Sequence, residues 1–250
     1  MNVVSYCLYG APTDPREQCD QTKTCDLYWK YAPLNIAIAN RLYPGWEVRL
    51  HVDAQFSSHP EHQPIATMAR SGLVTIVPVV TLSGHARMLW RLAPLFDIRV
   101  EHAVLRDLDS IISPTESRLV RLWLSGGQRI HCIRSHPFHS APIMGGLSGF
   151  HSQTFRQQTG MSSLTEVERC LPGDRRQTDQ QFLANHVLPR YGKGAVCDHR
   201  IRGCRRPNNP TLPTPTEWEA RLSILDEWFP VPGDYHVVTG LQAETIMGIA

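Results

Sequence analysis

The sequence predicts an α/β fold, in which a mainly parallel central sheet is flanked by helices on both faces and followed by an irregular C-terminal part. Apolar, β-prone segments alternate with segments of helical periodicity along roughly the first 110 residues. The 250 residues are 42% hydrophobic and 19% charged, which leaves room for a sizeable core. An Asp-x-Asp motif directly follows one apolar segment, at the kind of position where ligands bind such sheets.

Residues 3–10 form an apolar, β-prone run that stops at glycine, which predicts a buried first strand. The pattern of residues 34–42 predicts a helix closed by Pro44-Gly45, after which residues 46–53 alternate as a strand. Strand, helix, strand is the opening unit of an α/β domain. We expect the alternation to continue with a helix near 65–70, a strand over 73–78, a helix near 86–96 and a strand ending at Arg106.

The segment Ser113-Pro114-Thr115-Glu116 predicts the start of another helix. Ser113 is its expected N-cap, Pro114 lies in the first turn, and Glu116 completes a capping box. We expect this helix to end at Gly126-Gly127. The glycine-rich segment 144–150 has too little side chain to be a core element on its own, so we expect its backbone to approach something closely. The other expected elements are a strand over 129–134, a helix near 177–188, a late strand over 195–197 and extended, proline-rich chain over 207–215.

Charge and cysteine content exclude several classes of protein. The formal net charge of +2, from 25 Lys and Arg against 23 Asp and Glu, is too balanced for an electrostatic nucleic-acid binder. Seven cysteines without regular spacing fit reduced thiols in a cytosolic protein better than a disulfide framework. Neither a signal peptide nor a segment of membrane-spanning length is evident. We therefore expect a cytoplasmic protein, with one domain over residues 1–250 because no repeat or interdomain linker stands out.

The segment Arg106-Asp107-Leu108-Asp109-Ser110 is the most informative part of the chain. Side chains alternate along a strand, so Asp107 and Asp109 point the same way while Leu108 points to the core. Two neighbouring carboxylates repel each other unless a divalent cation or a shared proton lies between them. A metal site is one reading of this motif, and a turn, for which Asp and Ser are common residues, is the other.

Other strand ends favour the metal site. Tyr9 and Gly10 end the first expected strand and Asp53 ends the second, which would bring them to the same edge of the sheet as the acidic motif. A cation held by carboxylates keeps positions for water and phosphate oxygens, which is the usual way of binding a diphosphate with Mg²⁺ or Mn²⁺. This edge is therefore predicted to bind a nucleotide-type substrate.

Residues 85–95 (HARMLWRLAPL), with the following strand and acidic motif, resemble the donor-site half of GT-A-type nucleotide-sugar glycosyltransferases. The resemblance extends in order over most of residues 1–200. Its other segments are Tyr31 and Asn35 before Tyr43-Pro44-Gly45-Trp46, then Ile143-Met144-Gly145-Gly146, and Thr178-Asp179-Gln180-Gln181-Phe182-Leu183. It implies a donor half over about 1–110, an acceptor and catalytic half over about 111–200, and an irregular tail over 201–250.

The resemblance implies a role for each matching residue. Asp107 and Asp109 would coordinate Mn²⁺ or Mg²⁺ on the donor diphosphate, with Asp109 the more direct ligand and Asp107 nearer the sugar or ribose. His199 is a possible third ligand, or else a surface histidine. The segment that receives base and ribose matches Tyr6, Leu8, Tyr9 and Gly10.

Further matching positions surround the expected sugar. Arg87 and Arg91, one helical turn apart, could reach the sugar or diphosphate or else lie on a solvated helix face. Arg106 could pair with a nearby carboxylate and shape the site. Gly145 and Gly146 match a small-residue lining of the sugar site, with an ordinary turn as the alternative. One more residue, Asp179, would act near the reacting centre as a base or a sugar-orienting group, or would be a first-turn helix acid.

These expectations describe a glycosyltransferase, EC 2.4 class, that moves a sugar from a UDP- or GDP-sugar to a carbohydrate or other hydroxyl acceptor. Inversion and retention of the anomeric centre both stay open. Two alternatives use the same acidic pair: a metal-dependent phosphohydrolase or nucleotidyltransferase, and a noncatalytic nucleotide-sugar-binding module. Neither a phosphate-binding Gly-x-x-x-x-Gly-Lys loop nor a Gly-x-Ser-x-Gly elbow is present.

Overall fold

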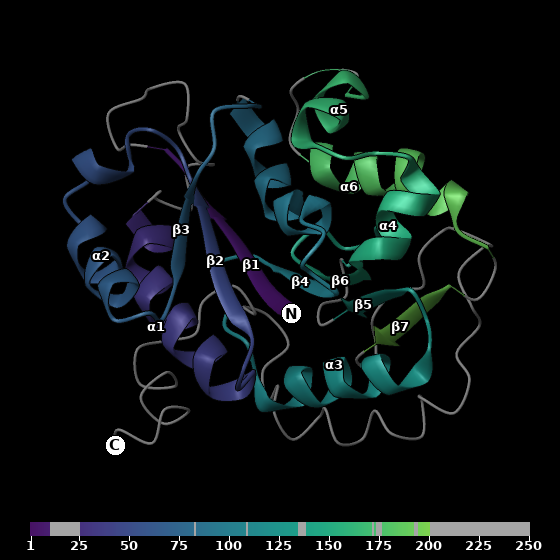
Figure 1. Ribbon diagram of the computed structural model, residues 1–250, viewed down its shortest axis with the longest axis horizontal. Helices are drawn as coiled ribbons and strands as arrows, with labels where there is room; N and C mark the ends of the chain where they lie inside the picture. The colour runs from purple at the N-terminus through teal and green to yellow at the C-terminus, as the bar shows by residue number, and fades with distance from the viewer. Residues whose placement is uncertain are drawn as a thin grey trace.

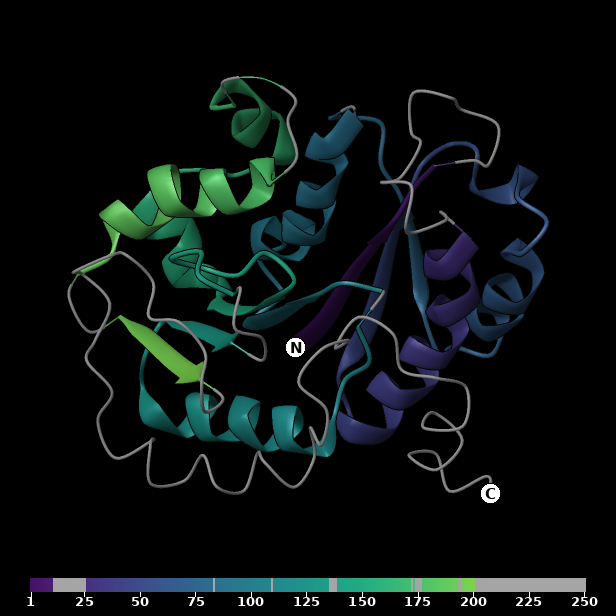
Figure 2. The same ribbon diagram turned by 180° about the vertical axis from the view of Figure 1, so that it is seen from behind.

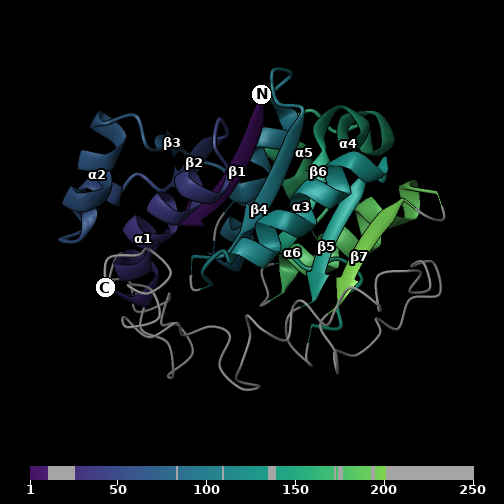
Figure 3. The ribbon, with the colours of Figure 1, turned by 90° about the horizontal axis from the view of Figure 1, so that it is seen from below.

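The computed structural model describes residues 1–10, 26–82, 84–108, 110–134, 139–171, 173, 177–192 and 195–200. Their strands form one seven-stranded sheet in the order β3-β2-β1-β4-β6-β5-β7, which Figure 3 shows from one edge to the other. The strands are β1 Asn2–Leu8, β2 Glu47–Val52, β3 Thr75–Pro78, β4 His102–Arg106, β5 Ile130–Arg134, β6 Leu147–His151 and β7 Val196–Arg200.

The sheet is parallel in its first half and mixed in its second. Strands β3, β2, β1 and β4 pair in parallel, and β5 pairs in parallel with β7. Strand β6 lies between the two groups and runs antiparallel to both β4 and β5. The carboxyl ends of β1, β2 and β4 therefore meet at one edge of the sheet, as a functional edge of an α/β fold requires.

Helices cover both faces of the sheet, which confirms the predicted fold class (Figures 1 and 2). On one face α1, α2 and α3 bury aliphatic and aromatic side chains such as Ile36, Ile65 and Trp123 against β1, β2 and β4. On the other face η3, α4 and α6 form a second core around Trp90 and Phe150. The helical elements are α1 Asp26–Leu42, η2 Phe56–Ser58, α2 His62–Arg70, η3 Gly84–Phe96, α3 Pro114–Gly126, α4 Ser152–Thr159, α5 Leu164–Arg169, α6 Thr178–Phe182, η4 Leu183–Val187 and η5 Leu188–Arg190.

Strand β6 differs from the sequence-based expectation, which gave the glycine-rich segment 144–150 no core element. Residues Leu147–His151 are a central strand, bonded on both sides. Gly149 shows why a residue without a side chain is needed there: a Cβ atom at this position would lie 2.9 Å from the Trp123 ring of α3. The expectation was wrong because it assumed that a core strand needs large side chains of its own. Here the missing side chain of Gly149 leaves space for the ring of Trp123.

Among the described residues, no helix is both long enough and apolar enough to span a membrane. The expected proline-rich segment 207–215 and the tail 201–250 lie outside the described residues.

The start of α3 matches the sequence-based expectation in one respect. The Ser113 hydroxyl accepts a hydrogen bond from the Glu116 amide at 3.1 Å, with Pro114 in the first turn, and Gly127 ends the helix in a left-handed conformation. The Glu116 carboxylate does not complete the capping box but lies 3.1 Å from the Arg106 guanidinium. The Glu116 side chain thus contacts the buried Arg106 of β4 in place of the helix cap.

We predict that Ser113→Ala lowers the free energy of unfolding by about 1 kcal/mol, because one amide at the start of α3 loses its acceptor. Urea unfolding followed by circular dichroism measures the change. Ser125→Ala is the matched control, since the Ser125 hydroxyl only donates to the Leu122 carbonyl in the exposed last turn of the same helix. Equal losses in both variants would contradict the capping role.

Candidate functional site

A buried arginine on η3 joins two acidic side chains at the carboxyl edge of the sheet. The Arg91 guanidinium donates through one nitrogen to Oδ1 of Asp107 and through the other to Oδ2 of Asp179, the latter at 2.5 Å. Only 2% of the Arg91 side chain is exposed. Asp107 directly follows β4, and Asp179 lies in the first turn of α6. We call these three residues the Arg91 cluster.

The electrostatics of the Arg91 cluster are set by burial and by opposite charge. Burial works to lower the pKa of Arg91, but the charges of Asp107 and Asp179 outweigh it and hold the pKa above the ordinary value. The arginine is therefore fixed as a cation. With one guanidinium against two carboxylates, the cluster keeps a net negative charge, and 42% of the Asp107 side chain is open to solvent.

Two glycines lie directly against the carboxylates of the cluster. A Cβ atom at Gly145 would overlap the Asp179 carboxylate and lie 2.9 Å from an Arg91 nitrogen, and one at Gly146 would overlap the Asp107 carboxylate. Neither glycine has a positive φ, so backbone conformation does not require glycine at either position. The requirement is space, because any side chain here would displace an acidic group.

Arg106 supports the glycine segment from the opposite face of the sheet. Its side chain is buried, and it donates to the Gly146 carbonyl at 3.1 Å and to the Ser110 hydroxyl at 3.0 Å. Its Nε lies 3.1 Å from Oε1 of Glu116 on α3. Burial raises the pKa of Glu116 to about 7, although the Arg106 charge opposes this. Arg106 thus pairs with a carboxylate, and its expected role in shaping a site stays a prediction.

Arg134, which the sequence analysis missed, fixes the chain that precedes the glycines. It ends β5, its side chain is fully buried, and its Nε donates to Asp198 of β7 at 2.8 Å. Its other nitrogens donate to the carbonyls of His139, Ala141 and Pro142 at 3.0, 2.5 and 2.9 Å. Its signal in the sequence is an arginine at the last position of a mainly apolar strand, and Arg106 ends β4 in the same way.

A second group of expected donor-binding residues gathers where β1 and β2 end. The Asp53 carboxylate accepts from the Gly10 amide at 3.2 Å and lies 3.5 Å from Arg87. The Arg87 guanidinium lies 5.1 Å from the centre of the Tyr9 ring, which meets Trp90 edge to face at 5.6 Å. Arg87 thus contacts an aromatic ring and a carboxylate, in contrast to the solvated helix face that was the alternative.

Tyr6 and Leu8 lie in β1, directly before Tyr9, but point to the other face of the sheet. Both side chains are buried in the core under α1, and burial raises the pKa of Tyr6 well above its ordinary value. Whatever contact these two residues make with a ligand at the strand end is limited to the backbone. Tyr9 and Cys7, in contrast, face η3, where Arg91 lies.

The residues expected to bind a metal do not come together in the described part of the structure. Asp107 belongs to the Arg91 cluster on the η3 face, and Asp109 lies outside the described residues. His199 is fully buried in β7, with its Nε2 3.0 Å from the Cys197 sulfur and its ring 4.6 Å from the His131 ring. The Cys197 side chain belongs to the α3-side core, so the structure does not bring His199 to the Arg91 cluster.

Comparison with known proteins gives likenesses of fold. No protein-family model matches the sequence, and no curated protein matches it. A candidate nucleotide-diphospho-sugar transferase from Desulfovibrio desulfuricans G20 aligns over 80% of this chain and 79% of its own, with a TM-score of 0.45 and 15% identity. The 4-diphosphocytidyl-2C-methyl-D-erythritol synthase from Anaerococcus prevotii DSM 20548 covers 92% of this chain and 97% of its own, with a TM-score of 0.48 and 10% identity. TarS 1-349 from S. aureus covers 73% and 54%, with a TM-score of 0.38 and 12% identity.

We predict that Gly146→Ala lowers the free energy of unfolding by roughly 1 to 3 kcal/mol, because the new methyl group overlaps the Asp107 carboxylate. Gly192→Ala is the matched control, since nothing lies within 4 Å of a Cβ atom there. Urea unfolding of both variants tests the difference. Adding Asp107→Ala to Gly146→Ala should recover part of the loss, and strictly additive losses would contradict the proposed overlap.

We predict that Glu116 makes the fold less stable as pH rises from about 4.5 to about 7. The folded-state pKa lies above the unfolded one, so the folded protein binds the extra proton in this interval and loses that advantage as the proton leaves. Unfolding in urea at a series of pH values should show wild type losing stability relative to Glu116→Gln across the interval. An unchanged difference between the two proteins would contradict the raised pKa.

Proposed function

We propose that this chain is a metal-dependent glycosyltransferase that moves a sugar from a nucleotide diphosphate donor, a UDP- or GDP-sugar, to an acceptor hydroxyl. The observation that carries the proposal is the Arg91 cluster with the backbone of Gly145 and Gly146 against its carboxylates. Two acidic groups held in place by one arginine, one of them open to solvent, offer oriented hydrogen-bond acceptors for a hydroxyl-rich ligand such as a sugar.

The cluster suits a hard divalent cation. Carboxylate oxygens are ligands that Mg²⁺ and Mn²⁺ prefer, and the half-exposed Asp107 keeps a net negative site open to solvent. We infer that Asp107 would hold the ion, while Asp109, the other carboxylate of the motif, lies outside the described residues. This support does not extend to His199, whose ring contacts Cys197 and His131. When bound, such a cation offsets the charge of the departing diphosphate.

Arg91 then has a positioning role in the reaction. Its planar fork fixes both carboxylates in one arrangement, and its burial prevents water from competing for the same hydrogen bonds. The Asp179 carboxylate, buried beside Gly145, would take the acceptor hydroxyl proton or orient the donor sugar. Which of these two roles it has decides between inversion and retention, and we leave that choice to product stereochemistry.

The end of β1 would receive the nucleotide. Tyr9 presents an aromatic ring that contacts both Arg87 and Trp90, and such a ring can stack on a base. Asp53 fixes the Gly10 amide, so the backbone at the strand end keeps a defined path. Since β1 and β4 are adjacent parallel strands, a nucleotide bound here would extend its diphosphate toward Asp107.

We predict that Asp107→Asn and Asp179→Asn each lower the turnover of the accepted nucleotide sugar by about 100-fold or more, since both remove a charge at the reacting centre. The two variants should differ in binding. In a thermal-shift screen against nucleoside diphosphates, Asp107→Asn should abolish the Mn²⁺-dependent rise in Tm, whereas Asp179→Asn should keep it. The exposed Glu168→Gln is the matched carboxyl-to-amide control.

Product analysis decides between this function and its alternatives. A glycosyltransferase releases a nucleoside diphosphate and a glycosylated acceptor. Release of a nucleoside monophosphate or pyrophosphate would instead indicate a phosphohydrolase or nucleotidyltransferase, and donor binding without turnover would indicate a binding module. Full transferase activity in Asp107→Asn, or in excess chelator, would overturn the proposal.

A further inference from the structure

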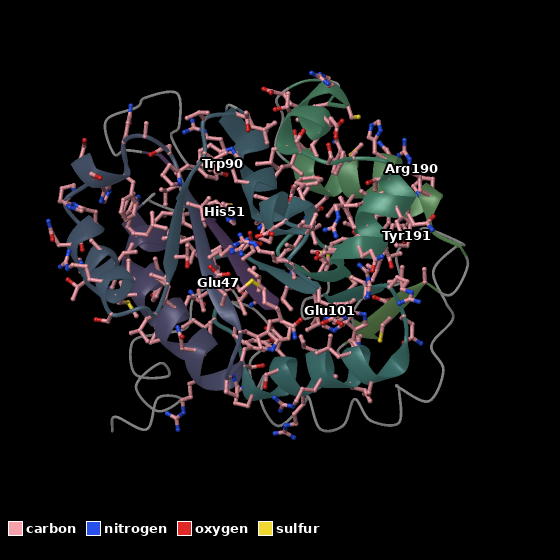
Figure 4. All side chains as sticks on the ribbon, in the orientation of Figure 1. Glu47, His51, Trp90, Glu101, Arg190 and Tyr191 are labelled. Atoms are coloured by element: carbon pink, nitrogen blue, oxygen red, sulfur yellow. The ribbon has the colours of Figure 1, made fainter. Side chains whose placement is uncertain are left out.

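We propose a second cation site, formed by Glu101, His102 and His151 at the amino-terminal end of β4. Among the described residues this is the one group in which three ligand atoms of His, Cys, Asp or Glu side chains lie within 4.8 Å of one another. It lies at the opposite end of β4 from Asp107, and Figure 4 places Glu101 beside the start of β1. The proposal is independent of the glycosyltransferase function.

The sheet itself brings the two histidines together. His102 of β4 and His151 of β6 are directly opposite residues of an antiparallel pair, and their ring centres lie 5.0 Å apart. Directly opposed side chains of such a pair share one face. Two imidazoles on neighbouring strands lose little further freedom when they bind an ion, because the strand pairing already fixes their distance.

Backbone hydrogen bonds hold the third ligand in place. The Glu101 amide donates to the Met1 carbonyl at 2.8 Å, and the Glu101 carbonyl accepts from the Ser152 amide at 2.8 Å. Its carboxylate lies 3.9 Å from Nδ1 of His102 and is largely exposed. The main chain is thus anchored while the carboxylate remains free to turn toward an ion between the histidines.

Neighbouring oxygens orient both rings. Nδ1 of His102 lies 3.1 Å from the Asn2 side-chain oxygen, and Nδ1 of His151 lies 3.0 Å from the Thr154 hydroxyl. A histidine that binds a metal through Nε2 donates its Nδ1 hydrogen to such an oxygen. In the ion-free protein the Thr154 amide donates to Nδ1 of His151 at 3.3 Å, which makes His151 the N-cap of α4. Ion binding through Nε2 would therefore keep the hydroxyl bond, with Nδ1 as its donor, and cost this cap bond.

The charge balance explains why the site includes a carboxylate. Two neutral imidazoles bring no charge to offset that of a bound cation. Positive charge also acts on the site, from Arg129 on both rings, from the amino terminus on His102 and from Arg156 on His151. The same positive charge would disfavour a cation, and Glu101 is the acidic group of the cluster that can offset it.

The ligand chemistry selects the class of ion. Two imidazole nitrogens and one carboxylate oxygen suit Zn²⁺, Co²⁺ or Ni²⁺, with water completing the coordination, whereas Mg²⁺ and Ca²⁺ prefer all-oxygen sites. Because His102 and His151 lie on β4 and β6, the ion would link the parallel half of the sheet to the strand that runs against it. Its expected effect is to stabilise the folded protein.

Cobalt titration of the chelator-treated, desalted full chain tests the site. We expect one saturable equivalent of Co²⁺ whose visible absorption depends on His102 and His151 and is displaced by Zn²⁺, together with a Zn²⁺-dependent rise in Tm. His102→Gln should abolish both signals, and Glu101→Gln, a change on an exposed side chain, should weaken binding at least about tenfold. The exposed His85→Gln should bind as wild type does.

Loss of the signal in His102→Gln would carry no weight if that variant were unfolded, so Glu101→Gln and circular dichroism of each variant decide the matter. Uptake that is unchanged in both His102→Gln and Glu101→Gln would place the ion elsewhere and overturn the proposal. Absence of saturable Co²⁺ or Zn²⁺ uptake in the parent protein would do the same.

Discussion

The pairing of buried Arg91 with Asp107 and Asp179 is the interaction on which the candidate site depends. A guanidinium taken out of water must be compensated by charge and hydrogen bonds, and these two carboxylates supply both. Their positions are 16 and 88 residues from Arg91, so one side chain ties η3, β4 and α6 together. Removing the arginine would leave two carboxylates facing each other at the sheet edge, with no fixed geometry.

Two more buried arginines bind backbone carbonyls of the chain beside these carboxylates. Arg134 holds three carbonyls ahead of the glycines, and Arg106 holds the carbonyl of Gly146 itself. Each is the last residue of a strand and each has an acidic partner, Asp198 and Glu116. Buried arginines thus fix the segment that approaches the acidic groups before any ligand binds, and a site preorganised in this way avoids an ordering cost on binding.

The local sequence pattern predicted most helices and strands, but which strands pair and which side chains meet was visible only in the structure. The alternation of strands and helices, the N-cap at Ser113 and the strand exit before Asp107 are readable because they depend on residues close in sequence. The roles predicted for Asp107, Arg91 and Asp179 stay predictions, although the structure brings the three side chains together. Pairing of β6 and the contacts of Arg134 were missed, since the Asp198 partner of Arg134 is 64 residues away and carries no local signal.

The position of the two proposed ion sites at opposite ends of β4 limits how strongly they can influence each other. His102 and Asp107 are five residues apart along an extended strand, which separates them by about 17 Å. That exceeds the Debye length of about 10 Å at 0.1 M salt, so direct repulsion between two bound cations would be small where solvent reaches both. A coupling between the sites would instead require two discrete arrangements of β4 against Arg91 and η3, and a strand paired on both sides by β1 and β6 favours a single one. The far site is therefore expected to act on the stability of the sheet and not on the chemistry at Asp107.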